Sequence, residues 1–155
     1  MTEKIPQYPA GTEEQREKPK LELWVVDDDT GIGRNLCEVI EDVGHYATSY
    51  FRTAATAIEE LTRRVAHSEE LPHGVIMDGN LSYEDPEELR KGASVIARMR
   101  AVTNQNERTI LFIANSGTDE DNEAMQNAGA ALTLGKANID KINSVLQSIE
   151  KHYER

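Results

Sequence analysis

The sequence of 155 residues contains one cysteine, few aromatic residues and no long run of hydrophobic residues. The single cysteine, Cys37, excludes an internal disulfide and fits a reducing compartment. No stretch approaches the roughly 18 apolar residues of a membrane span. Residues 1–20 also lack the apolar core of a secretory signal. These absences predict a cytoplasmic protein that makes no contact with a membrane.

Positive charge is scarce as well, because 17 Lys and Arg stand against 28 Asp and Glu, for a formal net charge of −11. Binding to nucleic acid depends on clustered Lys and Arg, so we expect no nucleic-acid partner. The length suits one hydrophobic core. Residues 1–20 hold three prolines among charges that cancel, which predicts a disordered tail before one folded domain over residues 21–152.

Short β-prone runs alternate with stretches that carry apolar residues at helical spacing. This alternation predicts an α/β protein with a doubly wound, five-stranded parallel sheet and helices on both faces. Right-handed crossovers leave few arrangements, and we expect the strand order 2-1-3-4-5. The predicted strands are residues 21–26, 46–50, 74–77, 109–114 and 131–134; the predicted helices lie at residues 32–43 and 54–66, around residues 95–99, after Thr118, and at residues 139–149.

Polar groups able to do chemistry follow four of the predicted strands. Ligands bind beyond the carboxyl ends of the strands in such sheets, so these groups should line one crevice. Adjacent carboxylates repel unless a cation lies between them, and oxygen ligands suit Mg²⁺, with Mn²⁺ as a second candidate. Carboxylates, a metal, a hydroxyl and a lysine together suit phosphoryl transfer, in which a carboxylate can act as the nucleophile. The groups are Asp27 and Asp28 after the first strand, Asp78 after the third, Ser116 after the fourth and Lys136 after the fifth.

Over residues 21–149 these motifs together resemble the receiver domains of two-component response regulators. The motifs are Val25-Val26-Asp27-Asp28-Asp29, Val75-Ile76-Met77-Asp78-Gly79-Asn80, Ile113-Ala114-Asn115-Ser116-Gly117 and Leu134-Gly135-Lys136.

The resemblance implies a role for each matching residue. Asp78 matches the phosphoacceptor and is also a metal ligand. Asp27, Asp28 and the backbone carbonyl of Asn80 match the other metal contacts. Ser116 matches the hydroxyl that turns to the phosphoryl oxygen, and Lys136 matches the lysine that pairs with it.

We therefore expect a stand-alone receiver that takes a phosphoryl group from a sensor histidine kinase or a histidine phosphotransfer protein. It would signal by binding an unidentified downstream protein, through the face formed by its fourth helix, fifth strand and fifth helix. Transfer to and from Asp78 would be its only catalysis, and we expect a monomer or a weak dimer. Two alternatives stay open: a haloacid-dehalogenase-like phosphatase with Asp27 as nucleophile, and a receiver-like module that binds partners without phosphorylation.

Three features depart from the family pattern. Thr133 stands where the family often has an aromatic residue, so the usual inward rotation of a ring is in doubt. Ala137 replaces the proline that usually follows the lysine in a cis bond, which costs ~3 kcal/mol before a non-proline residue. The stretch over residues 83–91 is longer than usual and acidic, with Glu84, Asp85, Glu87 and Glu88.

Overall fold

The computed structural model describes residues 20–81, 87–104 and 109–154. Their five strands form one sheet in which every pairing is parallel, in the order β2-β1-β3-β4-β5. The predicted fold class and strand order are therefore confirmed. The tail was predicted over residues 1–20, and all of it except residue 20 lies outside the described residues, as do the acidic residues Glu84 and Asp85. The elements are β1 (Leu21–Val26), α2 (Thr30–Val43), β2 (Tyr46–Phe51), α3 (Ala54–Ala66), β3 (Gly74–Met77), the 3₁₀ helix η2 (Glu87–Arg90), α4 (Gly92–Val102), β4 (Leu111–Ala114), α5 (Asp119–Ala128), β5 (Leu132–Thr133), the 3₁₀ helix η3 (Lys136–Lys141) and α6 (Ile142–Tyr153).

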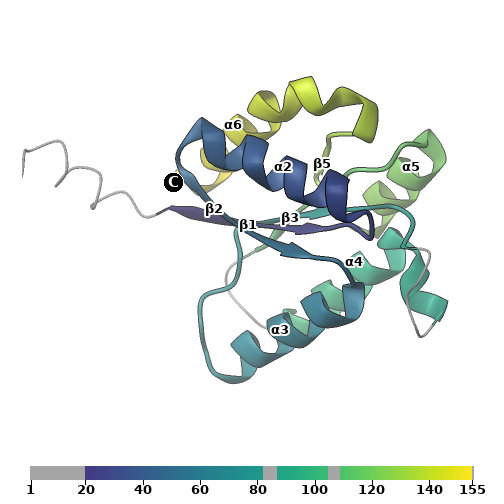
Figure 1. The fold of residues 1–155 in the computed structure, drawn as a ribbon. Coiled ribbons are helices and arrows are strands. Elements are labelled where there is room, and N and C mark those ends of the chain that lie inside the picture. The colour runs from purple at the N-terminus through teal and green to yellow at the C-terminus, as the bar shows by residue number, and fades with distance from the viewer. Residues whose placement is uncertain (1–19, 82–86, 105–108, 155) are drawn as a thin grey trace, which may run out of the picture.

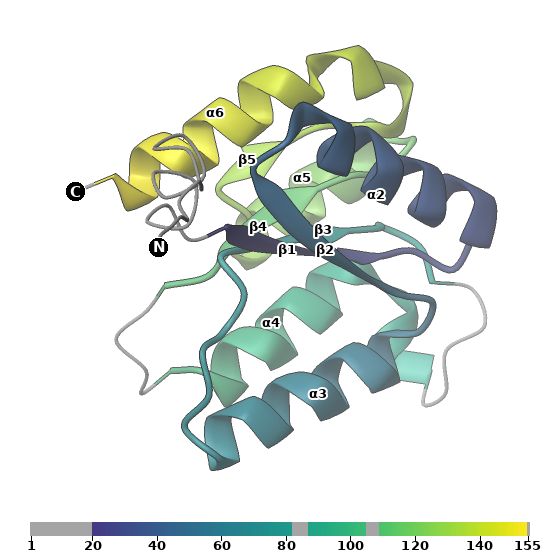
Figure 2. The same ribbon diagram turned by 60° about the vertical axis from the view of Figure 1, so that its left-hand side comes forward.

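Helices cover both faces of the sheet. In Figure 1, α2 and α6 lie above the sheet, and α3 and α4 lie below it; Figure 2 shows the same layers from another side. Met125 of α5 packs in the core on the α3 and α4 side. No helix within the described ranges is long and apolar enough to cross a membrane.

The central strands β1, β3 and β4 are buried on both faces over most of their length, so their consecutive side chains alternate between two apolar cores. Trp24 and Val26 of β1 belong to the core beneath α3, α4 and α5. Leu23 and Val25 belong to the core beneath α2 and α6. The same alternation runs through β3 and β4, so the face occupied by a residue just beyond a strand follows from its position in the sequence.

Local signals place the helix ends near the strand ends. The side chain of Asp29 caps α2 by accepting from the N–H of Ile32, and Gly44 ends that helix with φ 111°. The side chain of Thr118 caps α5 by accepting from the N–H of Asp121. Each cap keeps the loop between a strand and the next helix short, which holds the polar residues at the carboxyl edge of the sheet.

The last two predicted elements differ most from the structure. The fifth strand has only the two residues Leu132 and Thr133. The closing helix begins with the 3₁₀ segment η3, and regular α-helix starts only at Ile142. Gly135 with φ 83° and Asn138 with non-helical angles interrupt the backbone there. The helical spacing of the apolar residues predicted the helix but could not reveal these interruptions.

Candidate functional site

Three polar residues form a row across the carboxyl edge of the sheet. The N–H of Asp27 donates to the carbonyl of Phe51 at 3.1 Å, so the ladder of hydrogen bonds continues past the end of β1. The N–H groups of Asp78 and Asn115 continue the ladder in the same way on β3 and β4. By the alternation of the strands, the three side chains lie on the α2 and α6 face. All three are buried, with Asp27 1%, Asp78 3% and Asn115 3% exposed.

Three carboxylates meet at one end of this row. Asp27, Asp28 and Asp78 each offer an oxygen, and these oxygens lie within 4.8 Å of one another. Oxygens that share one Mg²⁺ are separated by up to about 4.2 Å, since each lies about 2.1 Å from the ion. The set is thus close to the size of a single ligand sphere. Asn80 adjoins it, since its N–H donates to Oδ1 of Asp78 at 3.3 Å.

Lys136 compensates the charge of two of these carboxylates. Its Nζ lies 3.0 Å from Oδ1 of Asp78 and 3.2 Å from Oδ2 of Asp27. Burial alone would lower the pKa of Lys136, but the hydrogen bond and charge of Asp78, helped by Asp27, raise it above its ordinary value. The lysine is therefore a fixed positive charge beside these carboxylates.

The pKa of the Asp78 carboxyl is raised, whereas pairing with a lysine ordinarily lowers the pKa of a carboxyl. Burial and the negative charge of Asp27 raise it to about 6, although the hydrogen bond and charge of Lys136 act to lower it. Within the described chain its second oxygen, Oδ2, is buried and has no hydrogen-bond partner. A buried acceptor without a donor, beside two other carboxylates, fits the coordination of a divalent cation.

Ser116 lies beside the row, with its hydroxyl bonded to the start of α5. Its Oγ accepts from the N–H of Thr118 at 3.2 Å and lies 3.4 Å from Oδ2 of Asp121. A Cβ built on Gly79 would lie 2.7 Å from the Cβ of Ser116, so the serine packs against the backbone directly after Asp78. Its predicted contact with a phosphoryl oxygen would require the hydroxyl to exchange these partners.

Three further residues build the site, and none of them was assigned a role from the sequence. The first is Asn115 in the row. The second is Tyr50, whose hydroxyl donates to the carbonyl of Asp27 at 2.7 Å from the neighbouring strand β2. The third is Gly92, because a Cβ there would lie 2.2 Å from the carbonyl oxygen of Asp78. Only the aligned strands reveal these contacts, since each joins residues far apart in the sequence.

The departure at Thr133 has a structural counterpart. Its side chain is exposed, and its hydroxyl oxygen accepts from Nε2 of Gln126 at 2.6 Å. The hydrogen bond ties β5 to α5 at the place where the family often has a ring.

The acidic stretch is closed at its base, since Asn80 pairs with Lys91 and the N–H of Leu81 donates to the carbonyl of Arg90 at 2.7 Å. Glu87 and Glu88 lie in η2.

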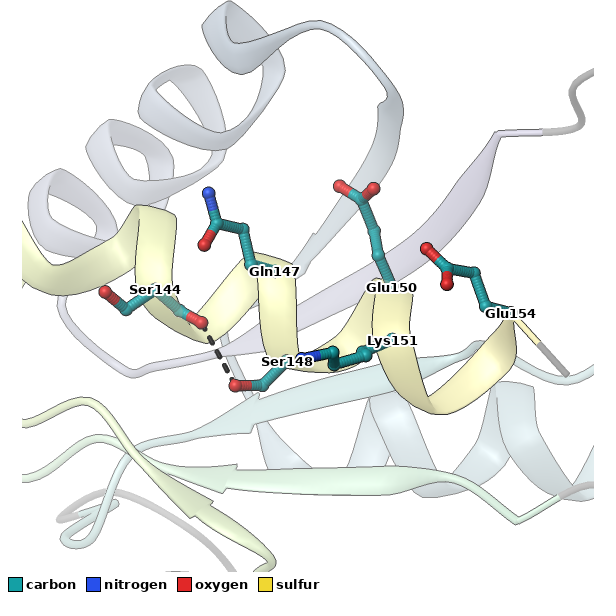
Figure 3. Close-up of a pocket in the computed structure, with 6 residues that line it drawn as sticks. All are labelled: Ser144, Gln147, Ser148, Glu150, Lys151 and Glu154. Atoms are coloured by element: carbon teal, nitrogen blue, oxygen red, sulfur yellow. Dashed lines mark hydrogen bonds between the residues drawn. The ribbon is translucent and has the colours of Figure 1, made fainter.

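A pocket lies along α6, apart from the carboxylate cluster (Figure 3). Among its lining residues, the hydroxyl of Ser148 donates to the carbonyl of Ser144 within the helix at 3.1 Å. All of the lining residues come from one polar helix face, and none of them belongs to the row or to the carboxylate cluster. The lining residues are Ser144, Gln147, Ser148, Glu150, Lys151 and Glu154.

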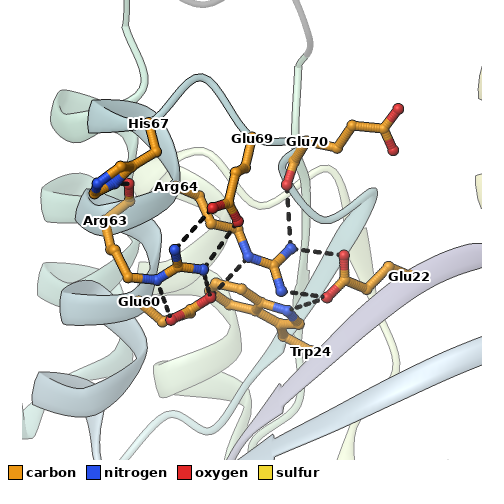
Figure 4. Close-up of polar contacts among 8 residues, drawn as sticks. All are labelled: Glu22, Trp24, Glu60, Arg63, Arg64, His67, Glu69 and Glu70. Carbon is orange, nitrogen blue, oxygen red and sulfur yellow. Dashed lines mark hydrogen bonds and ion pairs between the residues drawn. The ribbon is translucent and has the colours of Figure 1, made fainter.

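A network of ion pairs joins β1 to α3 near the opposite edge of the sheet (Figure 4). The Arg64 guanidinium binds both carboxylate oxygens of Glu22 at 2.8 and 2.9 Å, and the indole N–H of Trp24 donates to Glu22 at 3.0 Å. Glu60 connects Arg64 to Arg63. Every charged group of the network has a partner, which is typical of a structural contact rather than of a binding site.

Neither a family model nor a curated protein matches the chain. Solved structures do match it. A CheY-like response regulator receiver domain from Methylobacillus flagellatus is 22% identical with a TM-score of 0.68, and the match covers 84% of this chain and 99% of that one.

Two other matches show the same similarity. The receiver domain of the histidine kinase CKI1 from Arabidopsis thaliana, complexed with Mg²⁺ and BeF3⁻, is 20% identical with a TM-score of 0.68, over 90% of this chain and 95% of that one. A CheY-like receiver domain protein from Methanospirillum hungatei is 20% identical with a TM-score of 0.62, over 86% and 98%. The resemblance that the motifs predicted is confirmed for the fold: the chain has the fold of CheY-like response-regulator receiver domains.

Proposed function

We propose that this chain is a signalling receiver that accepts a phosphoryl group on Asp78 from a sensor histidine kinase or a histidine phosphotransfer protein. The observation that carries the proposal is the setting of the Asp78 carboxylate. It lies at the carboxyl end of a central strand, 3.0 Å from the Lys136 ammonium, and one of its oxygens has no hydrogen-bond partner among the described residues. A buried carboxylate and a fixed cation thus lie side by side, which supports the role of Asp78 as the nucleophile.

In the proposed reaction, a carboxylate oxygen of Asp78 attacks the phosphorus of a phosphohistidine. The new O–P bond forms as the P–N bond breaks, and the departing imidazole nitrogen keeps the electron pair and takes a proton. Negative charge is spread over the phosphoryl oxygens during transfer, and Lys136 is placed to stabilise it. Asp78 must be ionised to attack, so with its pKa near 6 it is ready to react at neutral pH.

Asp27, Asp28, Asp78 and the backbone carbonyl of Asn80 would hold the metal ion, either Mg²⁺ or Mn²⁺. Bound there, the ion would supply positive charge for the phosphoryl oxygens. The three carboxylates that lie within 4.8 Å of one another support this assignment.

We propose that the signal leaves by way of α5. Ser116 bonds to residues at the start of that helix, and Gln126 near its end binds Thr133. Phosphorylation adds roughly −1.5 to −2 charges beside these contacts. The added charge would change these hydrogen bonds and so alter the surface of α5, β5 and α6, where a downstream protein would dock. Such a change does not require an aromatic ring at position 133.

The experiment is labelling with the small phosphodonor phosphoramidate in the presence of Mg²⁺, read by intact-protein mass spectrometry. We expect one acid-stable phosphoryl group per chain, lost in Asp78→Asn and lost when EDTA removes the metal. Asp29→Asn is the matched control, because it removes a neighbouring carboxylate while Asn caps a helix as well as Asp does. This control should label like the wild type.

Other outcomes would support the two alternatives. Repeated turnover of a phosphate ester, lost in Asp27→Asn but kept in Asp78→Asn, would indicate a phosphatase. Absence of labelling in the wild type, with phosphoramidate and with a purified histidine phosphotransfer protein as donors, would leave only a phosphorylation-independent binding module.

A further inference from the structure

Asn115 has an unusual environment for a buried amide. It directly follows β4, and its side chain is 3% exposed. Its Oδ1 is buried and has no hydrogen-bond partner within the described ranges. Nearly all buried polar side-chain atoms in proteins are paired, so such an atom calls for an explanation. Among the described residues, the other atom of this kind is Oδ2 of Asp78, at the end of the adjacent strand.

The sheet order places Asn115 at the end of β4, between the strand that precedes Asp78 and the strand that precedes Lys136. Lys136 follows β5, yet its Nζ reaches Asp78 after β3 and Asp27 after β1. Strand β4 lies between β5 and β3, so the lysine side chain must pass the end of β4, where Asn115 lies. The amide thus has the Asp78 carboxylate on one side and the path of the lysine on the other.

The alternation of side chains separates Asn115 from Ser116. Asn115 shares the face of Asp27 and Asp78, because all three continue the ladder in register. Ser116 packs against Gly79 on the other face, and its hydroxyl is bonded at the start of α5. Of the two polar residues after β4, the amide is the one in the row with the phosphoacceptor.

We propose that Asn115 is a phosphoryl-binding residue. Its Nδ2 donates a hydrogen bond to an oxygen of the phosphoryl group on Asp78, and its Oδ1 accepts one from the Lys136 ammonium. A carboxamide suits this position, since it offers a donor and an acceptor at once, whereas a carboxylate offers only acceptors. The inference rests on the proposed function, because it needs a phosphoryl group on Asp78.

The test measures binding of beryllofluoride, a phosphoryl mimic, in the presence of saturating Mg²⁺ by calorimetry. We compare the wild type with Asn115→Ala and with Ser116→Ala. A hydrogen bond to a charged group is lost in Asn115→Ala, so its affinity for beryllofluoride should fall by about tenfold or more. Its affinity for Mg²⁺ should stay within about twofold, and its unfolding temperature should not fall, since an unpaired acceptor is removed. The fall in affinity for beryllofluoride should be smaller in Ser116→Ala than in Asn115→Ala.

Three results would overturn the inference. The first is unchanged beryllofluoride binding by Asn115→Ala while the wild type binds, which leaves the proposed function intact. The second is a loss accompanied by a fall of several degrees in unfolding temperature, which would indicate a structural role. The third is absence of beryllofluoride binding by the wild type, which would remove the proposed function together with the inference.

Discussion

Lys136 Nζ lies 3.0 Å from Oδ1 of Asp78, although the two residues belong to loops after different, non-adjacent strands. The lysine also reaches Asp27 at 3.2 Å, so one cation balances two buried carboxylates. This relationship makes the ionisation of the site, its stability and its affinity for a metal depend on one another.

Lys136→Met should destabilise the metal-free protein. It leaves Asp27 and Asp78 buried without their shared cation, which lowers the free energy of unfolding by about 3 kcal/mol. Chemical denaturation at pH 7 in EDTA measures the change. Mg²⁺ should restore part of the loss by supplying the missing charge. An unfolding free energy equal to that of the wild type would show that the ion pairs contribute nothing.

Asp78→Asn should stabilise the metal-free protein in a manner that depends on pH. The pKa of Asp78 is raised to about 6, so the folded state binds the proton more tightly than the unfolded state does. Stability therefore falls as pH rises from about 4 to about 6. We expect the variant to exceed the wild type by about 2 kcal/mol at pH 7 and to match it near pH 4. Denaturation curves for both proteins across this pH range in EDTA test the prediction. A difference in unfolding free energy that does not change with pH would contradict it.

Mg²⁺ should stabilise the wild type by mass action. At a concentration tenfold above the dissociation constant, the gain is about 1.4 kcal/mol. Asp28→Asn should abolish this gain, because it removes one carboxylate of the three-residue cluster. Asp140→Asn removes an exposed carboxylate outside the cluster and should keep the gain. Thermal unfolding with increasing Mg²⁺ gives the comparison, and equal gains in the two variants would argue against the site.

Gly33→Ala should destabilise the protein, contrary to the usual effect of this change within a helix. Alanine normally favours a helix by about 1 kcal/mol over glycine. At Gly33, however, a Cβ would lie 2.2 Å from the ring of Tyr50, whose hydroxyl holds the carbonyl of Asp27. Displacement of the ring should cost about 1–3 kcal/mol of unfolding free energy and weaken Mg²⁺ binding.

Gly31→Ala is the matched control in the same helix. Its Cβ would meet only Oδ1 of Asp29, at an ordinary 3.4 Å, so this variant should be at least as stable as the wild type. A stable Gly33→Ala variant with normal Mg²⁺ affinity would show that the position of Tyr50 is unimportant for the site.

Glu22→Gln should destabilise the protein at neutral pH and much less in acid. Burial would raise the pKa of Glu22, but Arg64 and Trp24 lower it below its usual value. The stabilisation is therefore present above the unfolded pKa and is lost as pH falls through the folded pKa. We expect Glu22→Gln to lower the free energy of unfolding by about 1 kcal/mol at pH 7. Denaturation at pH 7 and pH 3 measures it, with the exposed Glu59→Gln as control, and a loss equal at both pH values would contradict the assignment.

The sequence predicted the features that depend on local chemistry. Strand-length apolar runs and helical spacing predicted the alternation of elements, and a helix was expected after Thr118, whose side chain caps α5. Asp27, Asp28, Asp78 and Lys136 were expected at one edge of the sheet because polar residues directly follow buried strands, and the structure brings them together. The chemical roles of these residues remain predictions for the labelling experiment.

Only the tertiary structure decided which side chains contact one another at that edge. Asn115 had no assigned role within its motif until the register of β3 and β4 placed it beside Asp78. Tyr50 looked like an ordinary strand residue until β2 paired with β1 and brought its hydroxyl to Asp27. Periodicity and residue type are properties of neighbours along the chain. Register and the reach of a side chain across a strand depend on how distant segments pack, so they exist only in the folded protein.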